Sequence, residues 1–324
     1  MTLVSSKLMR LDVSEHMPFC GVHSIAVEAF WSSELCEDQL PTQILFCKPG
    51  GAMNRNYFSL VAQEDYTYNF AHYMACRNII VVTIDHLGVG ESSVPKEGYE
   101  LTLETLAAAN DVAVQQILNL FANGKYCENL PALTKLRPIG VGHSMGAMLA
   151  VVQQYKYGSY QGLLLLGFCN RGIPDLLSEE QKPYIDNSAL ARRDAVILAR
   201  EYFIEPYVQN TRERAVVNGK AKKSLVSDIA KQAVAKTEAP LLAVGGMMSL
   251  IPGSIRPEME GVEVPIFLGI GDSDLIENPH TVPAEFPACK DISLIVLPQT
   301  GHNHFLYPTC TSFFEKMYRW LHLH

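Results

Sequence analysis

The sequence predicts an α/β fold in which a mostly parallel central sheet is flanked by helices and carries an inserted helical cap. Two observations predict the sheet: short, nearly continuous apolar runs recur along the chain, and helical patterns separate them. A third observation predicts the cap, because this alternation stops at residue 171 and resumes only after residue 262.

Two extended segments, residues 7–13 and 23–31, come before any helical pattern and suggest an antiparallel hairpin that leads into the sheet. Nearly continuous apolar runs follow, as expected for strands that are covered on both faces. These predicted strands are residues 43–47, 78–84, 137–141, 162–166, 264–270 and 292–297. The helices predicted between and after them are residues 56–76, 103–123, 145–157 and 309–323.

The segment 171–262 is predicted to be a helical cap inserted between two strands. Inside it, Ala191, Ala195, Leu198 and Tyr202 fall on one helical face, and residues 224–235 form a second helical pattern. Because the segment follows one strand and precedes the next, we expect a lid over the sheet edge. The core would then comprise residues 1–170 and 263–324.

Composition excludes several classes of protein. The chain has 324 residues, is 48% hydrophobic and carries a net charge of −8 without any run of Lys or Arg, so a nucleic-acid partner is not expected. No stretch reaches the ~18 apolar residues that a membrane-spanning helix needs, and the N-terminus does not have the pattern of a signal peptide. Nothing in the sequence indicates an oligomeric state.

The eight cysteines are scattered, with no CxxC and no His at metal-ligand spacing. They fit reduced thiols of a cytoplasmic protein, although a disulfide remains possible. Neither G-x-G-x-x-G nor G-x-x-x-x-G-K-[ST] occurs, so we expect no nucleotide cofactor and no metal.

The segment Gly142-His143-Ser144-Met145-Gly146 fits G-x-S-x-G, and it lies where a predicted strand ends and a predicted helix begins. Such a turn is tight, so glycines at both ends allow the serine to project its hydroxyl. The amides at the start of the helix favour a developing oxyanion. We therefore interpret Ser144 as a nucleophile.

On this motif and its context the chain resembles the α/β-hydrolase superfamily, in its serine-nucleophile branch with a helical cap. The resemblance implies an acid after a later strand and a histidine near the end. Gly271-Asp272-Ser273-Asp274 resembles the family's G-x-x-D turn and identifies Asp274 as the acid, with Asp272 as the alternative. Gly301-His302 resembles the terminal G-H and identifies His302 as the base, with His304 as the alternative.

The resemblance also implies an oxyanion hole of two backbone amides, those of Met145 and Gly51. Gly51 belongs to the loop 48–54, which is similar to the family's H-G-x loop except that Pro49 replaces the histidine, so the usual brace of this loop is in doubt. Residues 85–93 resemble a turn that is structural in the family. His143, inside the G-x-S-x-G motif, is expected to pack beside its strand.

The function that this predicts is hydrolysis of an ester-type bond, a carboxylester or a lactone, through an acyl-enzyme intermediate. The apolar cap residues, above all Met247 and Met248, suggest an uncharged, hydrophobic small-molecule substrate. Thioesterases, C–C bond hydrolases and non-hydrolytic lyases use the same triad and stay open as alternatives. So does a small-molecule receptor with a vestigial triad.

Overall fold

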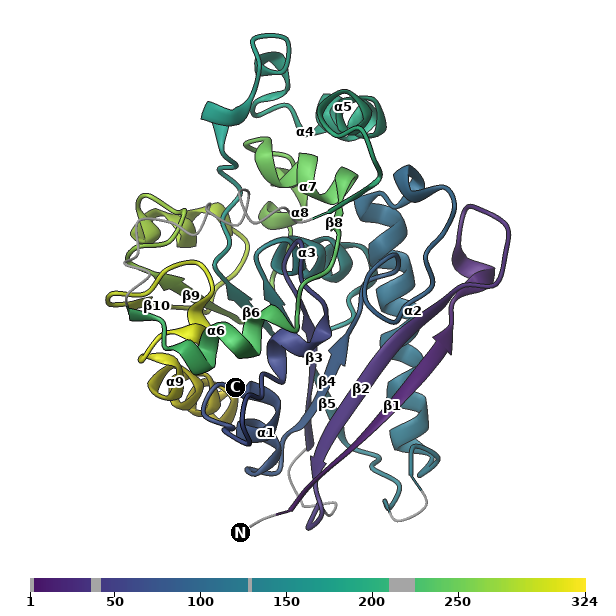
Figure 1. The fold of residues 1–324 in the computed structure, drawn as a ribbon, viewed down its shortest axis with the longest axis vertical. Helices are drawn as coiled ribbons and strands as arrows, with labels where there is room; N and C mark the ends of the chain where they lie inside the picture. Colours follow the sequence, from purple (N-terminus) through teal and green to yellow (C-terminus); the bar gives the residue numbers. More distant parts are fainter. Residues whose placement is uncertain (1–2, 36–41, 128–129, 210–224) are drawn as a thin grey trace.

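The computed structural model of the protein describes residues 3–35, 42–127, 130–209 and 225–324 (Figure 1). These residues form an eight-stranded sheet with the strand order β1-β2-β4-β3-β5-β6-β9-β10. The first three strands in this order pair antiparallel and all later pairs are parallel, as the sequence predicts. The strands of this sheet are β1 (Val4–Asp12), β2 (Ser24–Ser32), β3 (Thr42–Lys48), β4 (Ile80–Ile84), β5 (Leu136–His143), β6 (Leu163–Leu166), β9 (Ile266–Gly271) and β10 (Ile292–Leu297).

Helices cover both faces of the sheet, α2 and α3 on one side and α1 and α9 on the other (Figure 1). Side chains alternate between the two cores along each central strand: Ile44 and Phe46 join one core, whereas Leu45 and Cys47 join the other. The helices are α1 (Phe70–Ala75), α2 (Leu103–Ala122), α3 (Met145–Tyr157), α4 (Ser188–Arg193), α5 (Ala195–Tyr202), α6 (Asp228–Ala235), α7 (Ala243–Leu250), α8 (Arg256–Glu260) and α9 (Cys310–Leu323).

The predicted helix 56–76 is wrong over most of its length. A short 3-10 turn, Arg55–Phe58, is followed by turns, and the helix starts only at Phe70. Gln63 and Glu64 have φ of 53° and 61°, a left-handed conformation that interrupts a helix. The Asn69 side chain then accepts the His72 N–H and caps α1.

Between β6 and β9 the chain runs through α4, α5, α6, α7 and α8. Figure 1 shows α4, α5 and α7 above α3, whereas α6 lies lower, near α9. The expected helix through residues 191–202 is split into α4 and α5 at Asp194. A two-stranded antiparallel sheet, β7 (Tyr207–Val208) with β8 (Leu241–Leu242), was not expected. Of the predicted helix 224–235, residue 224 lies outside the described residues and α6 begins at Asp228, capped by Ser227.

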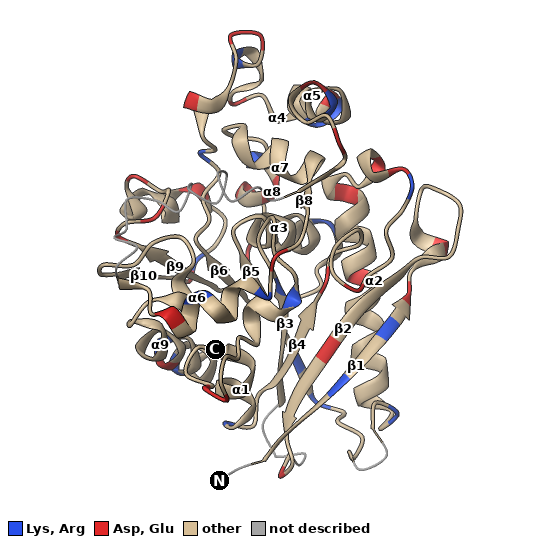
Figure 2. Cartoon of the chain, in the orientation of Figure 1, with Lys and Arg blue, Asp and Glu red and all other residues tan. Residues whose placement is uncertain are grey.

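Charged residues are spread over many elements in Figure 2, and among the described residues neither sign gathers on one element. In the part of the chain that is described, no helix is long and apolar enough to cross a bilayer.

Lys48, at the end of β3, is fully buried under α3. Its Nζ donates to the Tyr160 hydroxyl, which donates to Gln153 Oε1 at 2.9 Å. From there Gln153 Nε2 donates to Ser159 Oγ, and Ser159 donates to Asp111 Oδ1 at 2.6 Å. Each group in this chain donates in the direction that leads from the Lys48 ammonium to the Asp111 carboxylate. The aligned hydrogen bonds therefore stabilise the buried charge of Lys48.

Burial lowers the pKa of the Lys48 ammonium to about 7. Between that pKa and the ordinary lysine value of about 10.4, the unfolded chain binds a proton that the folded chain does not, so this group makes stability rise with pH. We expect Lys48→Met to be more stable relative to wild type at pH 6 than at pH 10, by at most about 5 kcal/mol. Urea denaturation at several pH values measures this difference. A stability gap independent of pH would contradict it, and Lys96→Met, at an exposed lysine, is the control variant.

Candidate active site

Ser144 lies between β5 and α3 in a strained conformation, with φ of 52° and ψ of −121°. The flanking glycines are required by packing: a Cβ on Gly142 would lie 2.4 Å from the Ala147 Cα, and one on Gly146 would lie 2.3 Å from the Lys48 carbonyl oxygen. The strand, turn and helix predicted around G-x-S-x-G are therefore present, and they project the serine hydroxyl from the end of the sheet.

Three of the predicted site residues come together although Ser144 and His302 are 158 positions apart in the chain. The loop after β10 places His302 Nε2 2.9 Å from Ser144 Oγ, and the loop after β9 places Asp274 Oδ1 2.7 Å from His302 Nδ1. A carboxylate can only accept, so His302 Nδ1 carries the proton and Nε2 is free to accept from the serine hydroxyl. This is the hydrogen-bond order that activates a serine.

Burial alone would raise the pKa of the Asp274 carboxyl, but the imidazoles of His302 and His304 hold this pKa well below its ordinary value. Asp274 is thus an anion at neutral pH. The alternative acid, Asp272, is instead exposed and accepts the backbone N–H groups of Gln299 and Thr300. It closes the turn and makes no contact with either histidine.

His304 does not approach the serine, which was its alternative role in the sequence analysis. It is fully buried, and its Nε2 lies 2.9 Å from Asp274 Oδ2, so both oxygens of this carboxylate accept from an imidazole. The sequence spacing of two residues indicated a rival base and gave no sign of this second contact to the acid.

His143, beside the nucleophile, also contacts the histidine loop. Its Nε2 donates to the His302 carbonyl oxygen at 2.8 Å, and its ring packs on Tyr57 with centroids 4.7 Å apart. Burial, followed by the neighbouring imidazoles of His302 and His304, lowers the pKa of His143 well below the ordinary value. It is therefore neutral, and it packs beside its strand as expected while also holding the loop of His302.

The loop 48–54 passes close to the nucleophile. A Cβ on Gly50 would lie 3.2 Å from the Ser144 Cβ, and one on Gly51 would lie 3.8 Å from the Met145 Sδ. Among the described residues, neither the Gly51 nor the Met145 backbone N–H has a hydrogen-bond acceptor. Both N–H groups are thus unpaired in the described part of the chain.

The brace that Pro49 removes from this loop is replaced by His86, which sequence analysis treated as part of a structural turn. Its Nε2 donates to the Pro49 carbonyl oxygen at 3.1 Å, and Asn110 lies 3.4 Å from its Nδ1. Burial lowers the pKa of His86 to about 4, which keeps this donor neutral at pH 7. A bridge between Met53 and Glu238 fixes the other end of the loop to the segment before β8.

A cavity of about 110 Å³ opens on the serine and His302. Apart from these two, its walls are mainly apolar and come from α3, α7 and the loops after β6 and β9. The apolar side chains among the described lining residues are Met145, Met148, Phe168, Ile173, Met248, Leu250, Ile251, Leu275 and Ile276. Met248 therefore lines the cavity, whereas Met247 is fully buried and is not among its lining residues.

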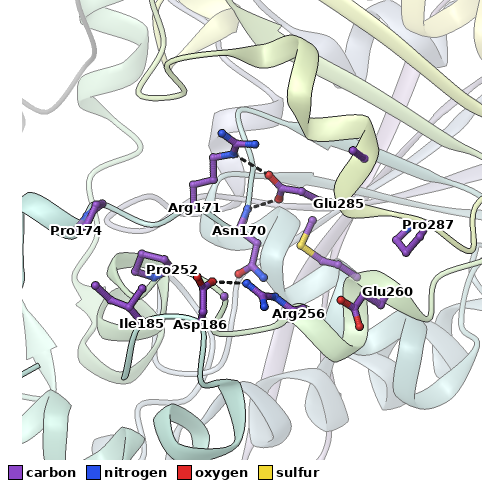
Figure 3. Close-up of a pocket in the computed structure, with 13 residues that line it drawn as sticks. Asn170, Arg171, Pro174, Ile185, Asp186, Pro252, Arg256, Glu260, Glu285 and Pro287 are labelled. Atoms are coloured by element: carbon purple, nitrogen blue, oxygen red, sulfur yellow. Dashed lines mark hydrogen bonds and ion pairs between the residues drawn. The ribbon is translucent and has the colours of Figure 1, made fainter. Parts of the chain in front are cut away.

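A larger cleft of about 510 Å³ shares Asn170 with this cavity and borders the segments 170–173 and 250–254 (Figure 3). These segments are joined by backbone hydrogen bonds, including Gly253 N–H to the Asn170 carbonyl at 2.8 Å. The two arginines that line the larger cleft form ion pairs, Arg171 with Glu285 and Arg256 with Asp186. Since none of the three triad residues lines it, the smaller cavity is the one that fits the chemistry.

Together these groups can carry out acyl transfer: a serine with a base, a base with an anion, two free amides and an apolar cavity. In the described part of the chain, no cluster of three or more His, Cys, Asp or Glu is arranged to hold a metal ion. His86, His143 and His304 are the residues whose contacts the sequence analysis missed, because each acts through a partner that is distant in sequence.

Comparison with known proteins gives the same fold. The profile of the Alpha/beta hydrolase family matches residues 44–309. No curated protein matches the chain. Similar solved structures include a thermophilic esterase from Thermogutta terrifontis, with TM-score 0.62, 17% identity, and 97% of this chain and 98% of that chain covered.

A thioesterase domain from the curacin biosynthetic pathway is similar with TM-score 0.61 and 16% identity, covering 97% of this chain and 99% of that chain. A bromoperoxidase from Bacillus anthracis has TM-score 0.57 and 15% identity, with 97% and 99% covered. At these identities the likeness concerns the fold, and the differing activities show that the fold alone does not determine the reaction.

Proposed function

Because this chain belongs to the alpha/beta hydrolase family, we propose that it is a serine hydrolase that cleaves an ester-type bond of an uncharged, hydrophobic small molecule. The observation that carries the proposal is the continuous hydrogen-bond chain from Ser144 Oγ through His302 to Asp274. A serine hydroxyl is a weak nucleophile at neutral pH unless such a base and orienting anion accompany it.

In the proposed reaction Ser144 Oγ attacks the carbonyl carbon while His302 Nε2 takes its proton. The amides of Gly51 and Met145 bind the oxyanion of the tetrahedral intermediate. His302 then returns the proton to the leaving alcohol, which departs and leaves an acyl-serine. Water, deprotonated by His302, attacks this ester, and His302 then returns that proton to Ser144 Oγ as the carboxylic acid is released.

The segment 171–262 is proposed to be a cap domain over this site, with residues 1–170 and 263–324 as the core. Met248 and Leu250 of α7 and Ile173 after β6 support this, since they form walls of the cavity that opens on Ser144. Arg192 of α4 fastens the cap to the core through Glu104 of α2 and also pairs with Glu258 of α8. Substrate selection would then lie in the cap and the chemistry in the core.

A cytoplasmic location is also proposed. All the cysteines that the structure describes, Cys20, Cys47, Cys76, Cys127, Cys169, Cys289 and Cys310, are free thiols. Free thiols fit a reducing compartment, in which disulfides rarely persist.

The proposed reaction is tested by measuring turnover on matched esters, lactones and thioesters of the same acyl group. We expect kcat/KM to be highest for an ester or a lactone. A preference for the thioester would identify the protein as a thioesterase, with the triad assignment unchanged. Carbon–carbon cleavage or elimination products would identify the hydrolase or lyase alternative. A protein that binds these compounds without turnover would be a receptor.

A chain-length series tests the apolar cavity. Each methylene that it buries should improve binding by about 0.8 kcal/mol until the cavity is full, so kcat/KM should rise with acyl length and then stop. Met248→Ala should move this limit to longer chains because it enlarges the cavity. Met247→Ala is the matched control, since it removes an equally buried neighbour on α7 that does not line the cavity.

The same series has outcomes that contradict the assignment. An unchanged limit in Met248→Ala, or an equal shift in Met247→Ala, would show that Met248 does not bound the acyl group. A preference of the wild type for charged esters would contradict the apolar cavity as the binding site while leaving the triad untouched.

A further inference from the structure

Two imidazoles contact the carboxylate of Asp274, and a third contacts the backbone of one of them. His302 Nδ1 lies 2.7 Å from Oδ1 and His304 Nε2 lies 2.9 Å from Oδ2, while His143 holds the carbonyl of His302. The ring centroids of His143 and His304 are 5.8 Å apart. The acid of the triad is thus held on both oxygens, and only one of its two imidazole partners reaches the serine.

We propose that His304 is a positioning residue of the catalytic site: its Nε2–H fixes Asp274 Oδ2 so that Oδ1 stays in line with His302. The proposal rests on the proposed serine hydrolase function, and it adds a fourth member to the triad. His304 touches neither the serine nor the cavity among the described residues, so it acts through Asp274.

A carboxylate needs this kind of support because its terminal torsion is broad. A single bond from His302 would leave it free to turn about its Cβ–Cγ bond and lose alignment. Two donors on different oxygens define its plane. The backbone N–H of Leu275, 2.6 Å from Oδ1, adds a third donor on the side of His302. His304 is then the donor to the opposite oxygen among the described residues.

The surroundings of His304 select one tautomer of its neutral ring. A carboxylate oxygen only accepts, so the proton of the neutral ring is on Nε2 and Nδ1 carries a lone pair. Nδ1 is buried and has no hydrogen-bond partner among the described residues. A proton on Nδ1 would be left buried without an acceptor, which is costly. Of the two neutral tautomers, the one with the proton on Nε2 is therefore favoured, and it can donate to Asp274.

The packing leaves His304 little freedom to move. Phe313 meets its ring edge to face at 5.7 Å. From the side of β6, Gly167 has a φ of 60°, and a Cβ there would lie 3.0 Å from His304 Cε1 and 3.2 Å from Asp274 Oδ2. The same Cβ would be 3.2 Å from His302 Nδ1. A residue without a side chain thus lets both imidazoles reach the carboxylate together.

The variants His304→Phe and His304→Gln test the proposal. Phenylalanine keeps a ring between Phe313 and His143 but cannot donate, whereas the glutamine amide can donate to Asp274 Oδ2. We expect His304→Phe to lower kcat by on the order of 10²-fold with KM within about twofold, as for a misplacement of about 1 Å in a catalytic group. His304→Gln should recover most of that loss, and the exposed control His280→Phe should keep the wild-type kcat.

Two spectroscopic readouts separate positioning from a merely structural role. The strongly deshielded proton of His302 Nδ1, bonded to Asp274, should be present in wild type and His304→Gln and shifted or lost in His304→Phe. In wild type, ¹⁵N spectra should show His304 as the neutral Nε2–H tautomer. This second measurement needs no variant, so it tests the proposal even where His304→Phe does not fold.

A kcat of His304→Phe within about threefold of wild type would overturn the proposal, since the expected loss is on the order of 10²-fold. So would a folded His304→Gln as impaired as His304→Phe, or a wild-type His304 with its proton on Nδ1. Failure of the proposed function looks different: wild type would lack turnover on every ester, lactone and thioester. The ¹⁵N tautomer of His304 would still report whether Asp274 is held on both oxygens.

Discussion

Replacing Ser144 by alanine is expected to lower kcat for ester hydrolysis by on the order of 10³-fold or more, while the protein stays folded. The hydroxyl is the group that would carry the acyl chain, and His302 has no other hydroxyl within hydrogen-bond reach among the described residues. Residual turnover would come from the oxyanion hole and substrate binding. Steady-state kinetics on the best ester of the panel, with a thermal melt of the variant, measure both effects.

A covalent label provides the control for this variant. Intact-mass analysis after fluorophosphonate treatment should show one adduct on wild type and none on Ser144→Ala. Ser312→Ala, which changes an exposed serine on α9, should be labelled and active like wild type. An adduct on another residue, or wild-type turnover by Ser144→Ala, would contradict a nucleophilic Ser144. Labelling without turnover on any substrate would favour the receptor alternative.

The sheet and the nucleophile could be predicted because their signals are local. Strands buried on both faces need unbroken apolar runs, as in residues 163–166 and 266–271, and a serine on a tight turn needs glycines at fixed offsets. The turns after β9 and β10 carry short motifs of the same kind. These features depend on neighbours in sequence, so one sequence is enough to find them.

The features that escaped prediction depend on contacts between distant residues. His86 supports the Pro49 carbonyl from across β3 and β4, and His304 reaches an acid thirty positions earlier in the chain. The sequence near either histidine does not indicate its hydrogen-bond partner. The failed helix at 56–76 has a local cause instead, since left-handed residues at 63 and 64 end the helical path in spite of an apolar pattern.

The second large effect is expected for Asp274→Asn, which should lower kcat/KM by on the order of 10³-fold or more, as removal of the triad acid does in other serine hydrolases. The variant removes the charge that stabilises the His302 imidazolium as it forms. Asp272→Asn is the matched control: it lies two residues earlier in the same turn and contacts backbone amides instead of histidines. The two variants are compared by kcat/KM on one substrate and by thermal melts.

Asp274→Asn also changes the hydrogen bonds at this position, in addition to removing the charge. Its two oxygens accept from two imidazoles, but an asparagine offers one oxygen and one NH₂. If the NH₂ faces His302, that ring must accept at Nδ1 and carry its proton on Nε2, where it can no longer take one from Ser144. If the NH₂ faces His304, the proton of that ring moves to the buried Nδ1, which has no acceptor among the described residues. The Leu275 N–H, 2.6 Å from Oδ1, favours an oxygen at that position and hence the second arrangement.

Asp274→Asn should therefore keep His302 aligned, lose the charge and also lower the melting temperature, whereas Asp272→Asn should leave kcat/KM within a few-fold of wild type. A larger loss of kcat/KM in Asp272→Asn than in Asp274→Asn would show that the acid of this site lies two residues earlier.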